Sequence, residues 1–216
     1  MRRVGVRERN IVQMKVGVAL VISALAVAAG CSGGASSATS SSLGTTPDGA
    51  RLTSTYDSSG KLETLEYDRN NDGKPDTWGF MNGTRVVRVE VDENGDGVVD
   101  RWEFHRADAG ASGTPGVAQP ADRTLEHVER ATKFDGKVSR WEYFTDGALA
   151  RIEEDSDGDG KVDKWESYRA GTLETLALDT QGRGKPDKRL VYAPDGSFVR
   201  MEADVTGTGT FEPLKP

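Results

Sequence analysis

Acidic and amide side chains recur at fixed spacing in two twelve-residue segments, one beginning at Asp92 and one at Asp155. In both, oxygen-bearing side chains stand at positions 1, 3, 5, 9 and 12, glycine stands at position 6, and position 7 offers its backbone carbonyl. Oxygens at this spacing converge as the chain curls, and the carboxylates repel one another unless a hard divalent cation offsets them. The candidate ligands are Asp92, Asn94, Asp96, Val98, Asp100 and Glu103 in the first segment, and Asp155, Asp157, Asp159, Lys161, Asp163 and Glu166 in the second.

A third segment, which begins at Asp68, keeps the pattern through position 9 but has Gly79 at position 12. Its candidate ligands are Asp68, Asn70, Asp72, Lys74 and Asp76. Three further segments begin at Ala131, Asp179 and Asp204, and each has lost acids from the pattern. The residues that replace them include Lys133, Arg183, Thr206 and Thr208. We expect these three segments to be structural turns.

The two complete segments resemble EF-hand calcium loops, whose pattern is D-x-[DN]-x-[DN]-G-x5-E. The resemblance implies calcium as the cofactor, a dissociation constant on the order of 0.1–1 mM, and a bidentate carboxylate at position 12. Magnesium is disfavoured because it demands a tighter octahedral shell. The resemblance covers the loops alone, because the short run Val86–Val91 replaces an EF-hand helix. The Asp68 segment is similar to the shorter calcium loops of thrombospondin type 3 or FG-GAP repeats, in which Asp76 would coordinate directly.

The six loops belong to an internal repeat. Their first residues are 24, 39, 24, 24 and 25 residues apart. The longer step contains an insertion near residues 106–123 that is rich in Gly, Ala and Pro, which predicts a disordered loop. All four tryptophans occupy position 11 of their units, and apolar residues stand three and six positions before every loop. Such register across six units indicates a repeat architecture.

Each repeat predicts a β-hairpin followed by an acidic loop. Asn82-Gly83 and Asp146-Gly147 lie between runs of aromatic and β-branched residues, which is a strong signal for a tight hairpin turn. A helix is an alternative for Thr124–Lys133, but runs of about eight residues that begin near glycine favour strands. The predicted fold class is all-β, with tandem β-hairpins that form an extended antiparallel sheet or roll and calcium loops between the hairpins.

Two further expectations concern the faces of this sheet. Alternation predicts that the tryptophans form an apolar face, while the glutamates two residues before each loop face water. Basic residues at position 10 are expected to pair with those glutamates across strands. The run Tyr56-Asp57 followed by Gly60-Lys61-Leu62 is loosely similar to YD-type (Rhs) repeats, which form arrays of β-hairpins.

The N-terminal segment differs from the rest of the chain. A basic head precedes a run of apolar and small residues that ends at Ala28-Ala29-Gly30-Cys31. The run is short for a membrane span and suits a secretory signal. Small residues before the cysteine resemble the bacterial lipobox, which implies a signal peptide at residues 1–30 and a lipid on Cys31. An uncleaved anchor helix with a free cysteine is the alternative. The Ser- and Gly-rich composition of residues 31–46 predicts a flexible tether, and residues 47–216 are predicted to form the repeat domain.

Composition excludes several classes of protein. The chain has 216 residues, one cysteine and a net charge of −7. Without residues 1–30 it has 23 basic and 34 acidic residues, which gives −11. The acidic balance excludes a nucleic-acid partner, and the single cysteine excludes an intrachain disulfide framework. His105 and His127 are isolated in the sequence, and no catalytic fingerprint accompanies them, so we expect no enzyme.

These observations predict a calcium-binding lipoprotein of the bacterial cell envelope with a structural or adhesive role. The lipid would anchor it to a membrane, and Ser32 after the cysteine implies the outer membrane. An envelope or extracellular protein or glycan is the expected further partner. Two alternatives stay open: a calcium-dependent carbohydrate- or protein-binding module of FG-GAP type, and a true helical EF-hand protein.

Overall fold

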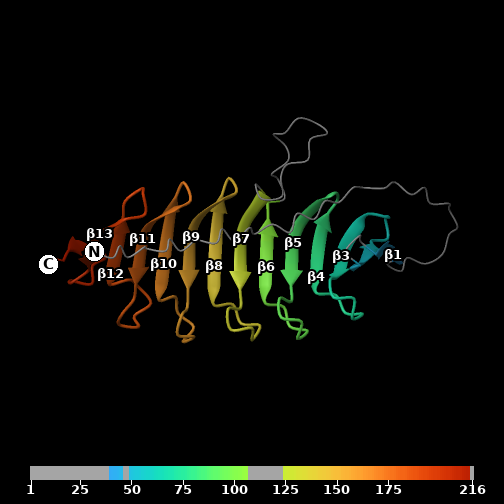
Figure 1. Cartoon of the computed structure of the whole chain (residues 1–216), viewed down its shortest axis with the longest axis horizontal. Coiled ribbons are helices and arrows are strands. Elements are labelled where there is room, and N and C mark those ends of the chain that lie inside the picture. The colour runs from blue at the N-terminus through green and yellow to red at the C-terminus, as the bar shows by residue number, and fades with distance from the viewer. Residues whose placement is uncertain (1–38, 46–48, 107–123, 215–216) are drawn as a thin grey trace, which may run out of the picture. The chain divides into compact units, whose positions relative to one another are not determined.

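The computed structural model describes residues 39–45, 49–106 and 124–214. The chain divides into a unit of residues 1–34, which lies outside the described residues, and a unit of residues 35–216. In the second unit, fourteen strands form one antiparallel sheet whose spatial order is the order of the chain (Figure 1). The prediction of an all-β fold of tandem hairpins is confirmed.

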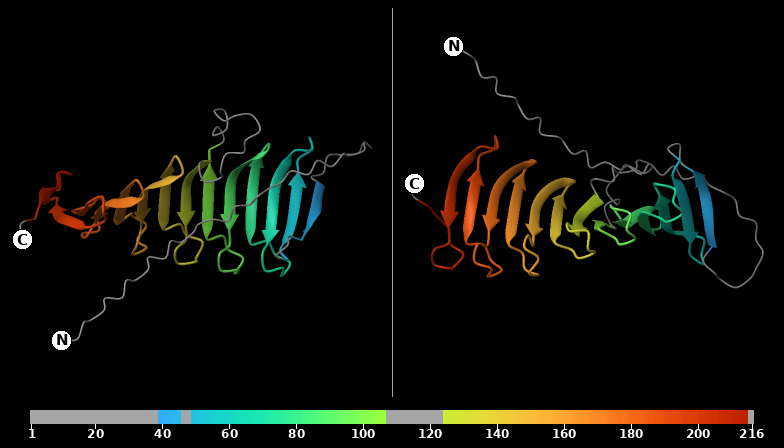
Figure 2. Two further views of the ribbon diagram at one scale, coloured as in Figure 1. Left: turned by 45° about the horizontal axis from the view of Figure 1, so that its top comes forward. Right: turned by 60° about the horizontal axis from the view of Figure 1, so that its bottom comes forward.

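The sheet is open rather than rolled, because β1 pairs with β2, β14 pairs with β13, and no pairing among the described residues joins β14 to β1. The strands rotate progressively along the sheet (Figure 2), as the right-handed twist of β-strands requires. The strands are β1 (Thr39–Thr45), β2 (Arg51–Tyr56), β3 (Leu62–Asp68), β4 (Thr77–Asn82), β5 (Arg85–Val91), β6 (Arg101–His105), β7 (Leu125–Arg130), β8 (Arg140–Thr145), β9 (Ala148–Glu154), β10 (Lys164–Arg169), β11 (Thr172–Leu178), β12 (Lys188–Tyr192), β13 (Phe198–Ala203) and β14 (Glu212–Pro213).

Several predictions for the N-terminal part and the insertion concern residues that the structure does not describe. The signal peptide at residues 1–30, the lipid site Cys31 and almost all of the insertion at 106–123 lie outside the described residues. Within the described residues, no helix has the length and apolar character needed to cross a membrane.

The sheet begins earlier in the chain than the predicted repeat domain. Residues 39–45, at the end of the Ser-rich tether, form β1 and pair with β2. The hydroxyl oxygens of Ser41 and Ser54 lie 3.0 Å apart, and Ser54 is fully buried. Backbone pairing needs no apolar side chains, so a Ser-rich segment can add a strand to the edge of a sheet.

Tight turns close the hairpins at one end of the strands. Asp146 and Gly147 have φ of 52° and 80°, and Ala170 and Gly171 have φ of 50° and 80°. Two central residues with positive φ define a type I′ turn, whose twist matches that of the two strands it joins. The turn prediction at Asp146-Gly147 is therefore confirmed.

The acidic loops project from the opposite ends of the strands, at the bottom of the sheet in Figure 1. The sheet's backbone hydrogen bonds continue to both ends of each complete loop. The Asp92 N–H donates to the Asp76 carbonyl (2.9 Å), and the Asp100 N–H donates to the Val91 carbonyl (2.9 Å). Positions 1 and 9 are thus fixed by the sheet. Successive loops lie two strands apart, a spacing of ~9.5 Å.

The expectation of an apolar tryptophan face is wrong. The register places Trp102 directly opposite Glu90 and Glu129, so tryptophans and glutamates alternate across the same face. Position 11 and the position two residues before a loop become cross-strand neighbours because the loop between them closes at position 9. Those glutamates pair with arginines on their own face, as in the 3.1 Å contact between Arg88 Nε and Glu90.

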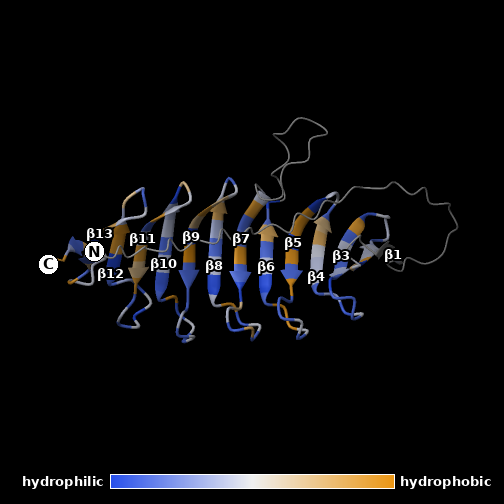
Figure 3. Ribbon diagram, viewed as in Figure 1, coloured by the Kyte–Doolittle hydropathy of each residue, from blue (hydrophilic) through white to orange (hydrophobic). Residues whose placement is uncertain are grey.

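The most buried apolar side chains lie on the other face, where they alternate with glutamates. Leu65, Val128 and Ile152 are each less than 5% exposed. Glu142 lies between Val128 and Ile152 in the register. Hydrophobic and hydrophilic residues therefore alternate across the strands of the sheet as well as along them (Figure 3).

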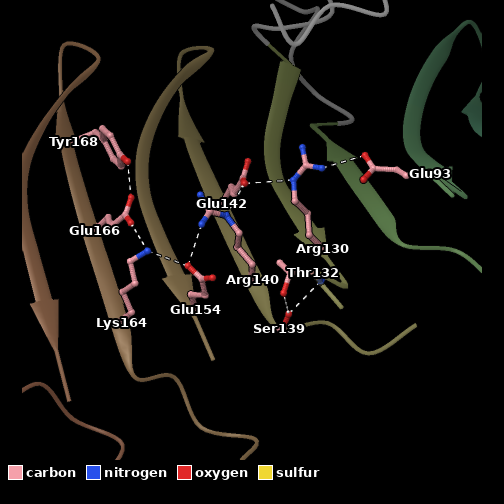
Figure 4. Close-up of polar contacts among 10 residues, drawn as sticks. All are labelled: Glu93, Arg130, Thr132, Ser139, Arg140, Glu142, Glu154, Lys164, Glu166 and Tyr168. Carbon is pink, nitrogen blue, oxygen red and sulfur yellow. Dashed lines mark hydrogen bonds and ion pairs between the residues drawn. The ribbon is translucent and has the colours of Figure 1, made fainter. Parts of the chain in front are cut away.

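An ionic ladder runs across this same face close to the loops (Figure 4). Arg140 contacts Glu142 (2.8 Å) and Glu154 (3.0 Å). Lys164 contacts Glu154 (3.1 Å) and Glu166 (2.8 Å). The basic residues at position 10 thus pair with glutamates at position 12 and at the strand end, and not with the predicted column two residues before the loop.

Candidate metal centre

The Asp92 loop connects β5 to β6 and is folded around its own carboxylates. The Asp92 carboxylate accepts hydrogen bonds from the N–H groups of Gly95 and Gly97, both at 2.7 Å. Gly97 has φ of 90°, which explains the glycine at position 6. The Asn94 side-chain oxygen accepts from the Asp96 N–H (2.9 Å). These bonds turn the side chains of positions 1 and 3 into the loop.

Asp100, at position 9, closes the base of this loop and is 1% exposed. Its Oδ2 accepts a hydrogen bond from the Glu93 N–H (3.1 Å). Its Oδ1 is buried and has no hydrogen-bond partner. Burial raises the pKa of Asp100, backbone hydrogen bonds from Glu93 and Asn94 oppose the rise, and the charges of Asp96 and Asp92 add to it. The carboxylates of positions 1, 5 and 9 therefore act on one another electrostatically.

The Asp155 loop, between β9 and β10, repeats this geometry. The Asp155 carboxylate accepts from the N–H groups of Gly158 (2.7 Å) and Gly160 (2.9 Å). One carboxylate oxygen from each of Asp155, Asp157 and Asp159 lies within 4.8 Å of the other two. Among the described residues this is the one cluster of three or more acidic, histidine or cysteine side chains with metal-ligand spacing. Such a cluster can hold a metal ion.

Position 9 differs between the two loops. Asp163 Oδ1 accepts from the Ser156 hydroxyl (2.6 Å), and its Oδ2 accepts from the N–H groups of Ser156 (3.1 Å) and Asp157 (3.2 Å). Both oxygens of Asp163 therefore have protein partners, whereas one oxygen of Asp100 does not. Glu93 stands where the second loop has Ser156, and it supplies no hydroxyl.

The Asp68 loop, between β3 and β4, has the same backbone pattern. The Asp68 carboxylate accepts from the Gly73 N–H (3.0 Å), and Asn70 Oδ1 accepts from the Asp72 N–H (2.9 Å). Asp76, at position 9, accepts from the Arg69 N–H (2.8 Å). The geometry of positions 1 to 9 is thus independent of position 12. At position 7, Lys74, Val98 and Lys161 each donate their N–H to the acid at position 5 (2.8 Å).

The structure does not bring the two predicted position-12 glutamates to the loops. Position 12 is the third residue of the following strand, where the side chain joins the ionic face. Glu103 pairs with Arg101 and lies 3.8 Å from His105. Glu166 contacts Lys164 (2.8 Å) and the Tyr168 hydroxyl (2.5 Å).

The pKa of Glu166 reflects these partners. Burial raises it, but hydrogen bonds from Lys164 and Tyr168 outweigh burial and hold the pKa below its usual range. In this structure the Glu166 carboxylate is therefore engaged in the ionic ladder and not in the loop. Among the described residues, the acids with metal-ligand spacing are those at positions 1, 3 and 5 of the Asp155 loop, and position 9 lies outside that cluster. The glycine at position 12 of the Asp68 loop was the sequence signal that the loop folds without an acid at that position.

The three degenerate loops replace the acidic cluster by other contacts. In the Ala131 loop, the hydroxyl oxygens of Thr132 and Ser139 lie 2.7 Å apart. In the Asp179 loop, the buried Asp187 accepts from the Thr180 hydroxyl (2.9 Å) and lies 3.9 Å from the Arg183 guanidinium. In the last loop, Asp204 retains its two glycine N–H partners. Hydroxyls and a guanidinium thus occupy positions that carry acids in the complete loops.

Comparison with known proteins finds no family model that matches the chain and no curated protein that matches it. The assignment of this centre therefore depends on the geometry and chemistry of the loops themselves.

Proposed function

We propose that the protein is a calcium-binding lipoprotein of the cell envelope, in which calcium stiffens the acidic loops at one end of the strands of a single β-sheet. The observation that carries the proposal is the buried, unpartnered Oδ1 of Asp100 beneath the Asp92 loop. A buried carboxylate oxygen without a partner is costly, and metal coordination is one of the few ways to satisfy it. This observation is independent of the motif from which the site was predicted.

The donor set favours calcium over other metals. It consists of carboxylate and amide oxygens, with no nearby sulfur or imidazole in the candidate positions. Hard cations prefer such ligands, and a loop held by backbone hydrogen bonds at both ends tolerates the larger and less regular shell of calcium. Calcium at the Asp92 and Asp155 loops would reduce repulsion within an acidic domain. Its role would be structural or adhesive.

The membrane anchor is supported by the sequence. Residues 1–30 have the basic head, apolar run and small residues of a lipoprotein signal, and Cys31 follows directly. A lipid on Cys31 would hold the repeat sheet at the membrane surface. Replacement of Cys31 by serine should move the protein from the membrane fraction to the soluble fraction. Retention in the membrane would indicate an uncleaved anchor instead.

The helical EF-hand alternative is wrong for these loops, because strands flank each of them. No helix pair is present to open on calcium binding in the described repeats, so the switch of EF-hand sensors does not apply.

Calorimetric titration of the full chain with calcium chloride tests the metal site. We expect heat of binding and a rise in Tm at 5–10 mM calcium, roughly tenfold above the affinity range of extracellular calcium modules. The double variant Asp92→Ala, Asp155→Ala should lose most of both effects, since each aspartate anchors its loop.

Asp195→Ala is the matched control. The Asp195 carboxylate also accepts a hydrogen bond within its own turn, from the Ser197 N–H (2.9 Å). This turn is a hairpin turn, at the end of the strands opposite to the acidic loops. This variant should keep calcium binding. If the unaltered protein shows neither heat nor a change in Tm, the calcium proposal is wrong.

A further inference from the structure

The two complete loops have different cationic neighbours. Lys133, from the adjacent Ala131 loop, reaches the Asp155 loop and donates from Nζ to the Asp157 carbonyl (3.4 Å). The ammonium lies so close to Gly158 that a Cβ there would be 2.5 Å from Nζ. A positive charge thus stands beside positions 3 and 4 of the loop that carries the three-aspartate cluster.

A second ammonium group adds to this charge. Lys161 Nζ lies 3.7 Å from Asp159 Oδ2 and also donates to the Gly182 carbonyl of the next loop (3.4 Å). Lys161 is part of the Asp155 loop itself, whereas Lys133 belongs to a different loop. Lys133 therefore makes the charge at this site depend on a neighbouring repeat.

The cations that reach the Asp92 loop are directed elsewhere. Arg101 and Arg130 both contact Glu93, at 2.8 and 3.1 Å. Glu93 stands at position 2, which is not a ligand position, so it neutralises the arginines outside the ligand set. The carboxylate at position 9 of this loop, Asp100, keeps an unpartnered oxygen. The arginines beside the Asp92 loop therefore pair with a glutamate outside the candidate ligands, whereas Lys133 stands directly beside the three-aspartate cluster of the Asp155 loop.

We infer that Lys133 is a tethered cation that competes with calcium at the Asp155 loop and lowers the calcium affinity of that loop. The inference rests on the proposed function, because it concerns the calcium affinity of one of the proposed calcium loops. Calcium at the Asp155 loop repels the Lys133 ammonium and releases it from the Asp157 carbonyl. Calcium binding at the Asp155 loop thereby breaks the contact that Lys133 makes between the Ala131 loop and the Asp155 loop.

The size of this effect follows from charge and screening. A single ammonium several ångströms from a divalent ion at the protein surface changes affinity by about two- to fivefold at low ionic strength. Salt weakens the effect, because the screening length falls to ~3 Å at 1 M ionic strength.

Site-resolved titration tests the inference. The Gly97 and Gly160 amides donate to Asp92 and Asp155, so their NMR resonances report separately on the two loops. In the full chain titrated with calcium chloride at low salt, each glycine resonance should move as calcium binds at its own loop. Lys133→Gln should lower the Gly160 midpoint about two- to fivefold, leave the Gly97 midpoint unchanged, and lose its effect in 1 M salt.

Lys137→Gln is the matched control. Lys137 lies in the same loop as Lys133 and carries the same charge, but it is the backbone N–H of Lys137 that donates a hydrogen bond, to the Asp135 carboxylate (3.0 Å). A Gly160 midpoint unchanged in Lys133→Gln, or lowered equally in Lys137→Gln, would overturn the inference while leaving calcium binding intact. If neither glycine responds to calcium in the unaltered protein, the proposed function itself is wrong.

Discussion

Asp100 and Asp163 occupy position 9 of the two complete loops, yet their carboxylates have different partners. Ser156 supplies a hydroxyl to Asp163 at 2.6 Å, and Glu93 at the equivalent position supplies none to Asp100. One residue at position 2 therefore decides whether the acid beneath the loop is satisfied by protein or left with an unpartnered oxygen. Removing the charge at position 9 should have opposite consequences in the two loops.

We predict that Asp100→Asn stabilises the calcium-free protein by about 1 kcal/mol, because it removes the charge of a buried carboxylate that has one oxygen without a partner. The same change should weaken calcium binding at the Asp92 loop at least tenfold. Urea unfolding in EDTA and a calcium titration followed at Gly97 measure the two effects.

Asp163→Asn is the control for this prediction. It disrupts hydrogen bonds that are already made, so it should destabilise the calcium-free protein by about 0.5–1.5 kcal/mol. Equal destabilisation by both variants would show that the unpartnered oxygen of Asp100 does not destabilise the calcium-free protein.

At the scale of elements, each complete loop is a nine-residue segment that backbone hydrogen bonds hold to the sheet at both ends. The sheet's hydrogen bonds fix positions 1 and 9, and Asp and Gly residues fold the chain between them. The next strand begins at position 10, as Arg101 and Lys164 show. Position 12 is therefore oriented by strand alternation, and its side chain joins the ionic face.

We predict that Glu166→Gln leaves the calcium midpoint of the Gly160 amide within about twofold of the unaltered protein, because Glu166 is engaged by Lys164 and Tyr168. An EF-hand loop would instead lose a bidentate ligand and most of its affinity. A large loss at Gly160 would show that calcium draws Glu166 out of the ionic ladder.

This difference marks how far the sequence could predict the site. The spacing of Asp92, Asn94 and Asp96 and the glycine at position 6 predicted a curled loop, because local Asx hydrogen bonds determine that shape. The partners of Glu166 and the alternation of Trp102 with glutamates could not be predicted. Both depend on cross-strand register, which is a non-local property set by where each loop closes.

At the scale of the whole molecule, ion pairs recur along the described sheet from β5 to β13. Glu202 is 4% exposed and pairs with Arg189 and, at 2.7 Å, with Arg200. The hydrogen bond from Arg189 lowers the pKa of Glu202 against the opposing effect of burial, and Arg200 lowers it further. A carboxyl group whose folded pKa is depressed stabilises the fold above its unfolded pKa and loses this contribution as pH falls through the folded pKa.

We predict that Glu202→Gln costs about 1–3 kcal/mol of unfolding free energy at pH 7, since it leaves two arginines without their charged partner. The difference from the unaltered protein should narrow as pH falls below the unfolded-state pKa of a glutamate, about 4.3, and through the lower folded pKa of Glu202. Urea unfolding followed by circular dichroism in EDTA measures it.

Glu212→Gln, on the exposed strand β14, is the control and should change stability by less than about 0.5 kcal/mol. A difference for Glu202→Gln that stays constant across this pH range would contradict the role assigned to its charge.

The order of the strands in space is the order of the strands in the chain, and each repeat contributes one hairpin and one loop. A repeat therefore has structural neighbours only in the repeats before and after it. An in-frame duplication of 24 residues would insert two strands and one loop without altering the register of the others. The spacing between metal loops would be preserved, so gene-level gain or loss of repeats changes the number of sites while each surviving site keeps its geometry.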